Sequence, residues 1–364
     1  MPTLTPEQIE QFGSELEQLR QQTQAKVGAE DARYIRRVVA IQRCLDWGGR
    51  IVMVLGFFHP VLWILGILML AASKILDNME IGHNVMHGQY DFMNDPHINS
   101  RRYEWDNAGD CDSWRRYHNY EHHTYTNVIG KDRDFGYGLL RLSDDLAWRP
   151  KNTWQMFTYI NLSLLFEWGV AYHELAAERI FIGKPRKDST LPISRKALRN
   201  AFFRKAGRQI FKDYIFFPLL CWPVALQVLL GNLIANLLRN LWTATIIFCG
   251  HFTENIHTFR EEDIKNETRA QWYYRQILGS SNIQGNKLFH ILTGHLSCQI
   301  EHHLFPDIPA PRYRDMAPQV QAICARYGIP YNTGRFSKQY GSVVKRIWRY
   351  SFPTTRHTAG ASAS

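Results

Sequence analysis

The stretch that decides the fold is residues 51–73, which read IVMVLGFFHPVLWILGILMLAAS and contain no Asp, Glu, Lys or Arg. A second stretch without these residues covers 214–238. A transmembrane helix needs about 20 consecutive, mostly apolar residues, so both stretches are long enough to cross a bilayer. The mean hydropathy of the chain is only -0.32, so much of it must lie in water. We therefore predict an integral membrane protein with a large extramembrane part.

Both apolar blocks contain a break in the middle. His59-Pro60 interrupts the first block, and proline commonly marks a helix boundary. Gly231-Asn232 divides the second block in the same way. A single span over 51–72 is the alternative for the first block. We predict an all-α protein with four transmembrane helices in two hairpins, with spans at about 38–57, 60–78, 214–230 and 232–250.

Basic residues come before both apolar blocks. Arg33, Arg36 and Arg37 precede the first block, and seven Lys or Arg residues within 195–212 precede the second. Basic flanks favour the cytoplasmic side of a membrane. Two hairpins place both ends of both blocks on that side, whereas single spans would need another crossing. The active site is therefore predicted on the cytoplasmic side of the membrane. If the protein is bacterial, that membrane is the inner (cytoplasmic) membrane.

The remaining segments are assigned from their local composition. Thr5-Pro6 is typical of a helix start, and Ile9, Phe12 and Leu16 recur at helical spacing. Little of the chain has the composition of a β-strand. We predict a cytoplasmic N-terminal helical segment at 1–37, one domain at 38–351 with a helical cap formed in part by 88–153 and an interfacial helix at 154–170, and a disordered tail at 352–364.

The charge of the chain indicates its kind of partner, and its cysteines and first residues bear on disulfide bonds and secretion. The formal charge is +10. A basic face suits a lipid bilayer with anionic head groups, an anionic thioester carrier or an acidic electron donor. Nucleic acid is not predicted as a partner, because so much apolar sequence holds the protein at a membrane. The six cysteines form no C-x-x-C pair, and the first residues contain no apolar run, so neither a disulfide framework nor a cleaved signal peptide is expected.

The histidines indicate the chemistry. Neutral imidazole is the commonest protein ligand for first-row transition metals. One ion needs three or four such ligands, so a set of eight indicates two ions. The clusters are far apart in the sequence, so only folding can bring them together. The predicted ligands are His83 and His87, then His118, His122 and His123, then His302 and His303, and finally His251, which closes an apolar run.

The spacing within each cluster suits helical ligands. Residues four apart lie on one face of a helix, and adjacent residues point about 100° apart, so His122 and His123 can address different ions. His257 is a weaker candidate than His251. Acidic, amide and imidazole side chains near the clusters can accept the second imidazole N–H or support the fold. We predict such a supporting role for Asp77, Glu80, Asn84, Glu121, His295, Gln299 and Glu301.

Three motifs carry a resemblance to a known family. Gly82-His83-Asn84-Val85-Met86-His87, His118-Asn119-Tyr120-Glu121-His122-His123 and Gln299-Ile300-Glu301-His302-His303-Leu304-Phe305-Pro306 resemble the histidine boxes of integral-membrane fatty-acid desaturases. The resemblance covers residues 77–311. The third box, with glutamine leading, is similar to the front-end and the bacterial acyl-CoA or acyl-lipid branches. The resemblance implies a di-iron centre, O2 as oxidant, a cis double bond placed in a long-chain acyl-CoA or acyl-lipid, and four spans.

The resemblance also bears on electron supply and on the substrate site. Many front-end members carry a fused cytochrome b5 domain with a His-Pro-Gly-Gly motif, and this sequence has no such motif. Electrons are therefore expected from a separate donor of the ferredoxin and reductase type or the cytochrome b5 type. The acyl chain is expected in a dry, bent tunnel. The predicted wall residues are Trp105, Trp114, Tyr120, Phe135 and Tyr137.

Three other functions are compatible with parts of this pattern. A fatty-acyl hydroxylase would use the same ligands and the same first hydrogen abstraction, and product analysis separates the two. A b-type cytochrome would hold haem between histidines inside facing spans, whereas these histidines lie at span ends and outside. A metal-storing or metal-transporting membrane protein would not need a shielded acyl tunnel.

Overall fold

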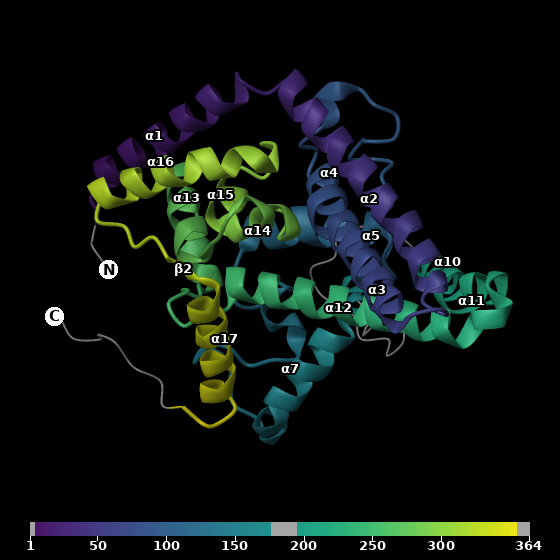
Figure 1. Ribbon diagram of the computed structural model, residues 1–364. Coiled ribbons are helices and arrows are strands. Elements are labelled where there is room, and N and C mark those ends of the chain that lie inside the picture. The colour runs from purple at the N-terminus through teal and green to yellow at the C-terminus, as the bar shows by residue number, and fades with distance from the viewer. Residues whose placement is uncertain (1–3, 176–194, 355–364) are drawn as a thin grey trace.

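The computed structural model describes residues 4–175 and 195–354, and the described chain is predominantly helical (Figure 1). This confirms the predicted helical class, and the only strands in the described part are β1 (Asn282–Gln284) and β2 (Thr333–Arg335), which pair in parallel. The predicted tail lies outside the described residues from 355 onward. The helices are α1 (Pro6–Gln24), α2 (Ala29–Leu55), α3 (Pro60–Ile75), α4 (Asn84–Met86), α5 (Cys111–Trp114), α6 (His123–Tyr125), α7 (Gln155–Leu164), α8 (Phe166–Glu174), α10 (Arg195–Ile210), α11 (Phe217–Leu220), α12 (Ala225–His251), α13 (Arg269–Leu278), α14 (Lys287–Leu292), α15 (Gln299–Leu304), α16 (Tyr313–Arg326) and α17 (Phe336–Tyr350).

Helices α2 and α3 form the first hairpin, and its turn falls where the sequence predicts it. Pro60 occupies the first turn of α3, and Nδ1 of His59 accepts a hydrogen bond from the backbone N–H of Val61. The two helices cross closely at Gly66. A Cβ atom there would lie 2.4 Å from the backbone nitrogen of Met53. Only glycine allows the helices to approach this closely.

The second hairpin has its turn in a different place from the prediction. Helix α10 continues through a π-helical turn at Phe211–Phe216 into α11, and the chain reverses at residues 221–224 before α12. Gly231 therefore lies inside α12, and the predicted spans at 214–230 and 232–250 are wrong at their shared boundary. A Cβ atom at Gly231 would lie 2.1 Å from Sδ of Met53. This glycine permits close helix packing rather than a turn.

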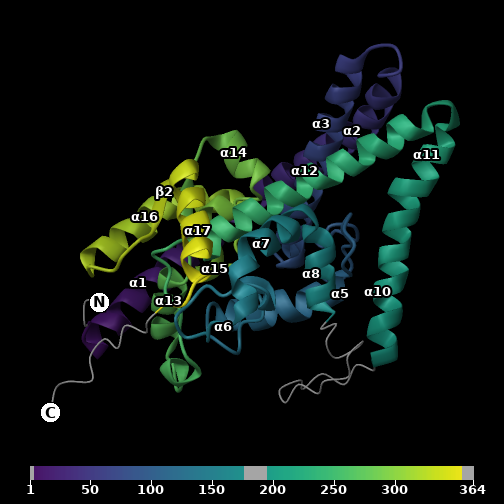
Figure 2. The same ribbon diagram turned by 90° about the horizontal axis from the view of Figure 1, so that it is seen from below.

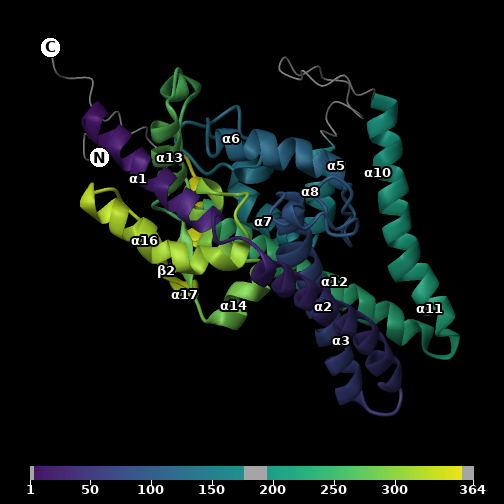
Figure 3. The same ribbon diagram turned by 90° about the horizontal axis from the view of Figure 1, so that it is seen from above.

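Two helical stretches are long and apolar enough to cross a membrane: Pro60–Met86 and Trp222–His251. The other arms of the two hairpins, α2 and α10, are more polar; α2, for example, carries the buried Arg50. Figures 2 and 3 show the two hairpins projecting from the same side of the molecule, away from α1, α13 and α16. The four-span topology remains a prediction.

Buried ion pairs connect the two hairpins to each other and connect α12 to α8. Nζ of Lys74 lies 2.8 Å from Asp213, and Arg50 lies 3.7 Å from the same carboxylate. Arg239 on α12 forms an ion pair with Glu167 on α8, and both side chains are 1% exposed. Lone buried charges would carry a large desolvation cost, so these pairs fix the relative position of the helices.

The remaining helices form the part of the molecule that lies away from the two hairpins. Helix α1 begins with a capping box made by Thr5 and Gln8, which confirms the predicted start, and Phe12 and Leu16 pack into a core shared with α13, α15 and α16. The predicted single helix at 154–170 is wrong, because the chain bends at Leu165 and forms α7 and α8 instead. Both helices pack against α12 and support the cavity described below.

Candidate metal centre

Each histidine cluster lies at a helix end or at an irregular helical turn. The long helix that begins with α3 passes through a π-helical turn at Leu76–His83 before α4, and a second π-helical turn spans Arg115–His122. Such turns are rare and occur frequently at functional sites. His251 is the last residue of α12, and the third cluster lies on α15. The fold thus brings four separate segments to one point.

The histidines form two groups in space. The ligand nitrogens of the first group, and separately those of the second, lie within 4.8 Å of one another. In the second group, Nε2 of His251 lies 3.3 Å from Nε2 of His122 and 3.2 Å from Nε2 of His303. Two groups agree with the expectation of two ions. The first group is His83, His87, His118 and His302, and the second is His122, His251 and His303.

His123 lies between the two groups. Its ring centroid is 4.6 Å from that of His87 and 4.8 Å from that of His302, and it stacks on His303 at 4.4 Å. All eight predicted ligands therefore meet in one buried cluster. This arrangement allows His123 to complete the coordination of one ion.

The hydrogen bonding of the cluster fits a metal. Within the described residues, several buried ring nitrogens have no hydrogen-bond partner, including both nitrogens of His123 and of His302 and Nε2 of His87. An unsatisfied buried polar atom costs about 1–3 kcal/mol, which coordination would offset. Burial and the neighbouring imidazoles hold the pKa of His87, His123 and His302 well below its usual range. Neutral imidazole is the form that coordinates transition metals.

Carboxylates orient two of these rings. Nδ1 of His122 lies 3.0 Å from Asp132, and Nδ1 of His118 lies 3.2 Å from Asp134. Burial alone would raise the pKa of Asp134, but hydrogen bonds from His118 and His173 hold it well below its usual range. Carboxylate partners of this kind fix the tautomer and strengthen the ligand. The sequence analysis missed both aspartates, although the Asp132-x-Asp134 pattern shortly after the second cluster was a signal.

Neutral side chains orient two further ligands. Nδ1 of His83 lies 3.1 Å from Oδ1 of Asn84, as predicted. Nδ1 of His303 lies 3.0 Å from Oε1 of Gln276 and 3.1 Å from Oγ1 of Thr126, and neither partner was predicted. Gln276 comes from α13, which carries no histidine, so only the three-dimensional fold reveals it.

Gln299 is the predicted supporting residue closest to the centre. Its Nε2 lies 2.9 Å from Nε2 of His251, within the second group of ligands. Glu121, also predicted, is half-buried beside His122 in the sequence. Gln299 therefore lies within reach of an ion bound by this group.

Three other predicted supporting residues have different partners. Oε2 of Glu80 lies 2.9 Å from Nδ1 of His295, so these two residues hold each other. Asp77 accepts hydrogen bonds from the Tyr103 hydroxyl and the Asp106 backbone, and Glu301 accepts them from Asn282 and Tyr331. These contacts join Asp77, Glu80 and Glu301 to residues other than the eight predicted ligands, so in them the three side chains support the fold around the centre.

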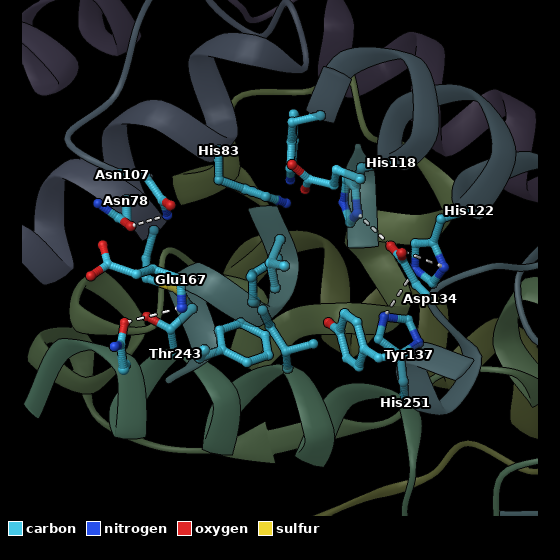
Figure 4. Close-up of a pocket in the computed structure, with 18 of the residues that line it drawn as sticks. Asn78, His83, Asn107, His118, His122, Asp134, Tyr137, Glu167, Thr243 and His251 are labelled. Carbon is cyan, nitrogen blue, oxygen red and sulfur yellow. Dashed lines mark hydrogen bonds and ion pairs between the residues drawn. The ribbon is translucent and has the colours of Figure 1, made fainter. Parts of the chain in front are cut away.

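A cavity adjoins the histidines. Figure 4 shows His83, His118, His122 and His251 on one side of it and Asn78, Glu167 and Thr243 on the other. Apolar walls such as Met79, Phe166 and Ile247 connect the two sides, as a site for an acyl chain requires.

The predicted tunnel residues divide into two sets. Trp105, Trp114 and Tyr137 line the cavity, in agreement with the prediction. Tyr120 is 66% exposed, and Phe135 packs in a core cluster behind Phe252, which itself lines the cavity. Tyr120 and Phe135 are not among the residues that line this cavity, and their contact with substrate stays a prediction. A sequence position near a histidine box does not determine which way an aromatic ring points.

Comparison with known proteins identifies the family. The fatty acid desaturase family model matches residues 58–335. The chain belongs to the fatty acid desaturase family. It is 42% identical to the NADPH-dependent stearoyl-CoA 9-desaturase of Mycobacterium tuberculosis over 354 residues, which cover 96% of this chain and 82% of that protein. It is 26% identical to the sn-1 linoleoyl-lipid 6-desaturase of Synechocystis over 285 residues, which cover 75% of this chain and 77% of the other.

The family confirms the predicted class of enzyme. This desaturase is an O2-dependent oxidoreductase that acts on fatty acyl chains. A mouse relative, fatty acid desaturase 2-like protein FADS2B, is 24% identical over 242 residues, which cover 64% of this chain and 45% of that protein. The histidine cluster is compatible with the metal site that such a family would use.

Proposed function

We propose that this desaturase introduces a cis double bond between C9 and C10 of a long-chain acyl-CoA such as stearoyl-CoA. The observation that carries the proposal is the 42% identity, over 96% of the chain, to a protein named for that reaction. Desaturation is favoured over hydroxylation, because the relatives found are named as desaturases. An acyl-lipid substrate is the competing choice, supported by the more distant lipid-linked relative.

The test is expression in a host that lacks unsaturated fatty acids, followed by mass spectrometry of the products. A new C9 double bond in the fatty acids of the host supports the proposal. A second assay then asks whether the purified enzyme, supplied with electrons, forms the same double bond on stearoyl-CoA. A double bond formed only on intact glycerolipid would replace acyl-CoA with acyl-lipid, and a hydroxy acid would replace desaturation altogether.

We further propose that two iron ions bind to the eight histidines. When bound, they would supply O2 activation and the removal of hydrogen from two neighbouring methylene groups. The protein's own part is to hold the ligands in place, with Asp132 and Asp134 fixing two of the rings. The apolar cavity walls hold the acyl chain and exclude water from the reaction. Metal analysis should find about two irons per chain, and one zinc without iron would refute the assignment.

The proposed enzyme spans the membrane four times, with its histidines on the cytoplasmic side. Trp222 lies at the turn before α12 and is 77% exposed. A hydrocarbon layer of about 30 Å is crossed by about 20 helical residues, which places Trp242 at the opposite interface. His251 then lies beyond the hydrocarbon, on the same side of the membrane as the start of α10, whose basic residues favour the cytoplasm. Cysteine labelling that finds residues 196–212 on the outer side would contradict this topology.

Electrons are proposed to come from a separate protein. Removing two hydrogens while reducing O2 to water requires two external electrons, and the sequence contains no haem or dinucleotide motif. Arg101, Arg102, Arg115 and Arg116 form basic segments near the second histidine cluster that suit an acidic carrier. We expect no product from the chain with NADPH alone and recovery with a reductase system. Turnover without added protein would refute the separate donor, and recovery that is insensitive to salt would refute the docking site.

A further inference from the structure

The cavity wall contains one carboxyl group with no assigned role. Glu174, the last residue of α8, is 4% exposed and lines the cavity. Its Oε2 atom has no hydrogen-bond partner among the described residues. An unsatisfied buried oxygen is costly, and in a cavity wall it indicates the position of a polar atom of the ligand. An acyl chain is apolar except at its head.

Glu174 is suited to donate a hydrogen bond. Burial, reinforced by the negative charges of Asp134 and Asp110, raises the pKa of Glu174 well above its usual range, and Arg133 and Arg116 oppose this only in part. The raised pKa favours the neutral carboxylic acid, which has one O–H donor. Oε2 lies against Gly109, where an added Cβ atom would be only 3.2 Å away, so a glycine here lets the carboxyl group approach the backbone closely.

The side of the cavity that carries Thr243 and Glu167 is less suited to the polar head of a substrate. The Thr243 hydroxyl also lacks a partner among the described residues, but it lies next to Arg239, whose donors are already used. This side therefore has no free cationic donor, and the methyl end of a chain fits it better. The N–H groups of Arg239 donate to the Asn240, Asn78 and Asn236 side chains, the Asp106 carbonyl and the Glu167 carboxylate.

Cationic groups lie near Glu174. Nη2 of Arg133 donates to the carbonyl of His173, and its Nη1 has no partner among the described residues. Arg116 is half-buried and donates to Ser113. Positive charge at this position favours the anionic phosphates of a CoA thioester. The head of the acyl chain therefore belongs on the Glu174 side.

We propose that Glu174 is a positioning residue that donates a hydrogen bond to the thioester carbonyl oxygen of the acyl-CoA. The inference rests on the proposed acyl-CoA substrate and adds the contact that fixes where the chain begins relative to the histidines. Fixing the carbonyl fixes which methylene groups lie at the metal centre. Glu174 thus contributes to the position of the double bond without taking part in hydrogen removal.

The test compares two substrates and three enzymes. Stearoyl-CoA is compared with its thioether analogue, in which CH2 replaces the carbonyl group. The enzymes are the wild type, Glu174→Met, which cannot donate, and Glu174→Gln, which keeps an N–H donor. The exposed Tyr172→Phe on the same helix is the matched control. Iron content and solubility of each variant show whether it has folded.

The wild type is expected to prefer the thioester by roughly tenfold in kcat/KM, the value of one hydrogen bond of this kind. Glu174→Met should lose most of that preference, chiefly through a higher KM for the thioester, and should form a broader set of double-bond positions. Glu174→Gln and Tyr172→Phe should keep the preference. A purely structural role would lower the rates with both substrates equally.

Each result decides between the alternatives. An unchanged preference in Glu174→Met overturns the role of Glu174 while the proposed function stands. A Glu174→Gln variant that folds but behaves like the Met variant also overturns it. If Glu174→Met fails to fold, the kcat/KM values for thioester and thioether are compared in the wild type and in Glu174→Gln. Equal values for the two substrates would exclude a hydrogen bond to the carbonyl and overturn the role of Glu174. Wild-type enzyme that acts on no acyl-CoA refutes both proposals together.

Discussion

The histidine centre and the Arg239 cluster are both buried and polar, and both adjoin the same cavity, yet their hydrogen bonding differs. Arg239 donates to five acceptors and is paired with Glu167. The histidine centre keeps buried nitrogens without partners among the described residues, such as those of His123 and His302. A buried group satisfied by the protein holds the fold together, whereas one left unsatisfied is ready for a ligand.

This difference predicts opposite behaviour on mutation. Removing a ligand from the histidine centre should abolish function and leave the protein folded. Removing one partner from the Arg239 cluster should leave an uncompensated buried charge and destabilise the protein. The predictions below test that contrast, beginning with the largest effect.

His87→Ala, His122→Ala and His303→Ala should each abolish desaturation, because each removes a ligand that comes from a different segment. Iron content should fall in parallel. The variants should still insert into the membrane, since the two long apolar helical stretches are unchanged. Product formation, iron per chain and membrane yield are the three measurements.

The control for the ligand variants is His97→Ala. His97 is exposed and contributes to neither ligand group. It should keep most of the activity. Full activity in the three ligand variants would show that the centre is not the catalytic site, and aggregation of all three would show that it is structural.

Arg239→Met should lower the free energy of unfolding by about 3–5 kcal/mol, because it leaves the Glu167 carboxylate buried without its partner. Glu167→Leu should do the same. The double variant should recover much of the loss, since an apolar pair of similar size carries no unpaired charge. Denaturation of the purified proteins in detergent, followed by a probe such as circular dichroism, measures the three values. Additive losses in the double variant would contradict a tightly coupled pair.

Asp132→Asn and Asp134→Asn should weaken iron binding by roughly 10–100-fold, the usual effect of losing the partner of a ligating imidazole. The fold should change little. Titration of the metal-free protein with ferrous iron measures the affinity. Asp112→Asn is the matched control, because its side chain is 74% exposed and pairs with Arg115 near the same segment. Equal affinities in all three variants would remove the two aspartates from the centre.

The eight ligands remain a prediction, but the structure brings their side chains together. Seven of them belong to clusters with a local pattern, whereas His251 only closes an apolar run. Residues four apart on a helix share a face wherever the helix lies, and His83 and His87 follow that rule, with ring centroids 4.7 Å apart. The partners of the rings follow no such rule. Gln276 reaches His303 from another helix, and the π-helical turns before His83 and His122 have no sequence signature.

The hairpin turns show the same limit. His59-Pro60 marks a turn because proline lacks an N–H group and restricts the preceding residue. Gly231 offered the wrong signal, because glycine serves both turns and close helix contacts. The true reversal at 221–224 includes Trp222-Pro223, an X-Pro step of the same kind as His59-Pro60. Composition alone does not separate a glycine that bends the chain from one that a neighbouring helix touches.

The final prediction asks whether close packing holds the first hairpin independently of the ion pairs. Gly66→Ala should lower the free energy of unfolding by about 1–3 kcal/mol, the usual range for overpacking. The new methyl group would lie 2.4 Å from the backbone nitrogen of Met53 and 2.6 Å from its Cα atom, so α2 itself must move. Gly207→Ala on α10 is the control, because nothing lies within 4 Å of its Cβ position. Alanine there should stabilise the helix by about 0.5–1 kcal/mol, since glycine loses more backbone entropy on folding. Opposite signs for the two substitutions in detergent denaturation would show that the α2–α3 contact depends on shape, and equal effects would assign its stability to the buried charges alone.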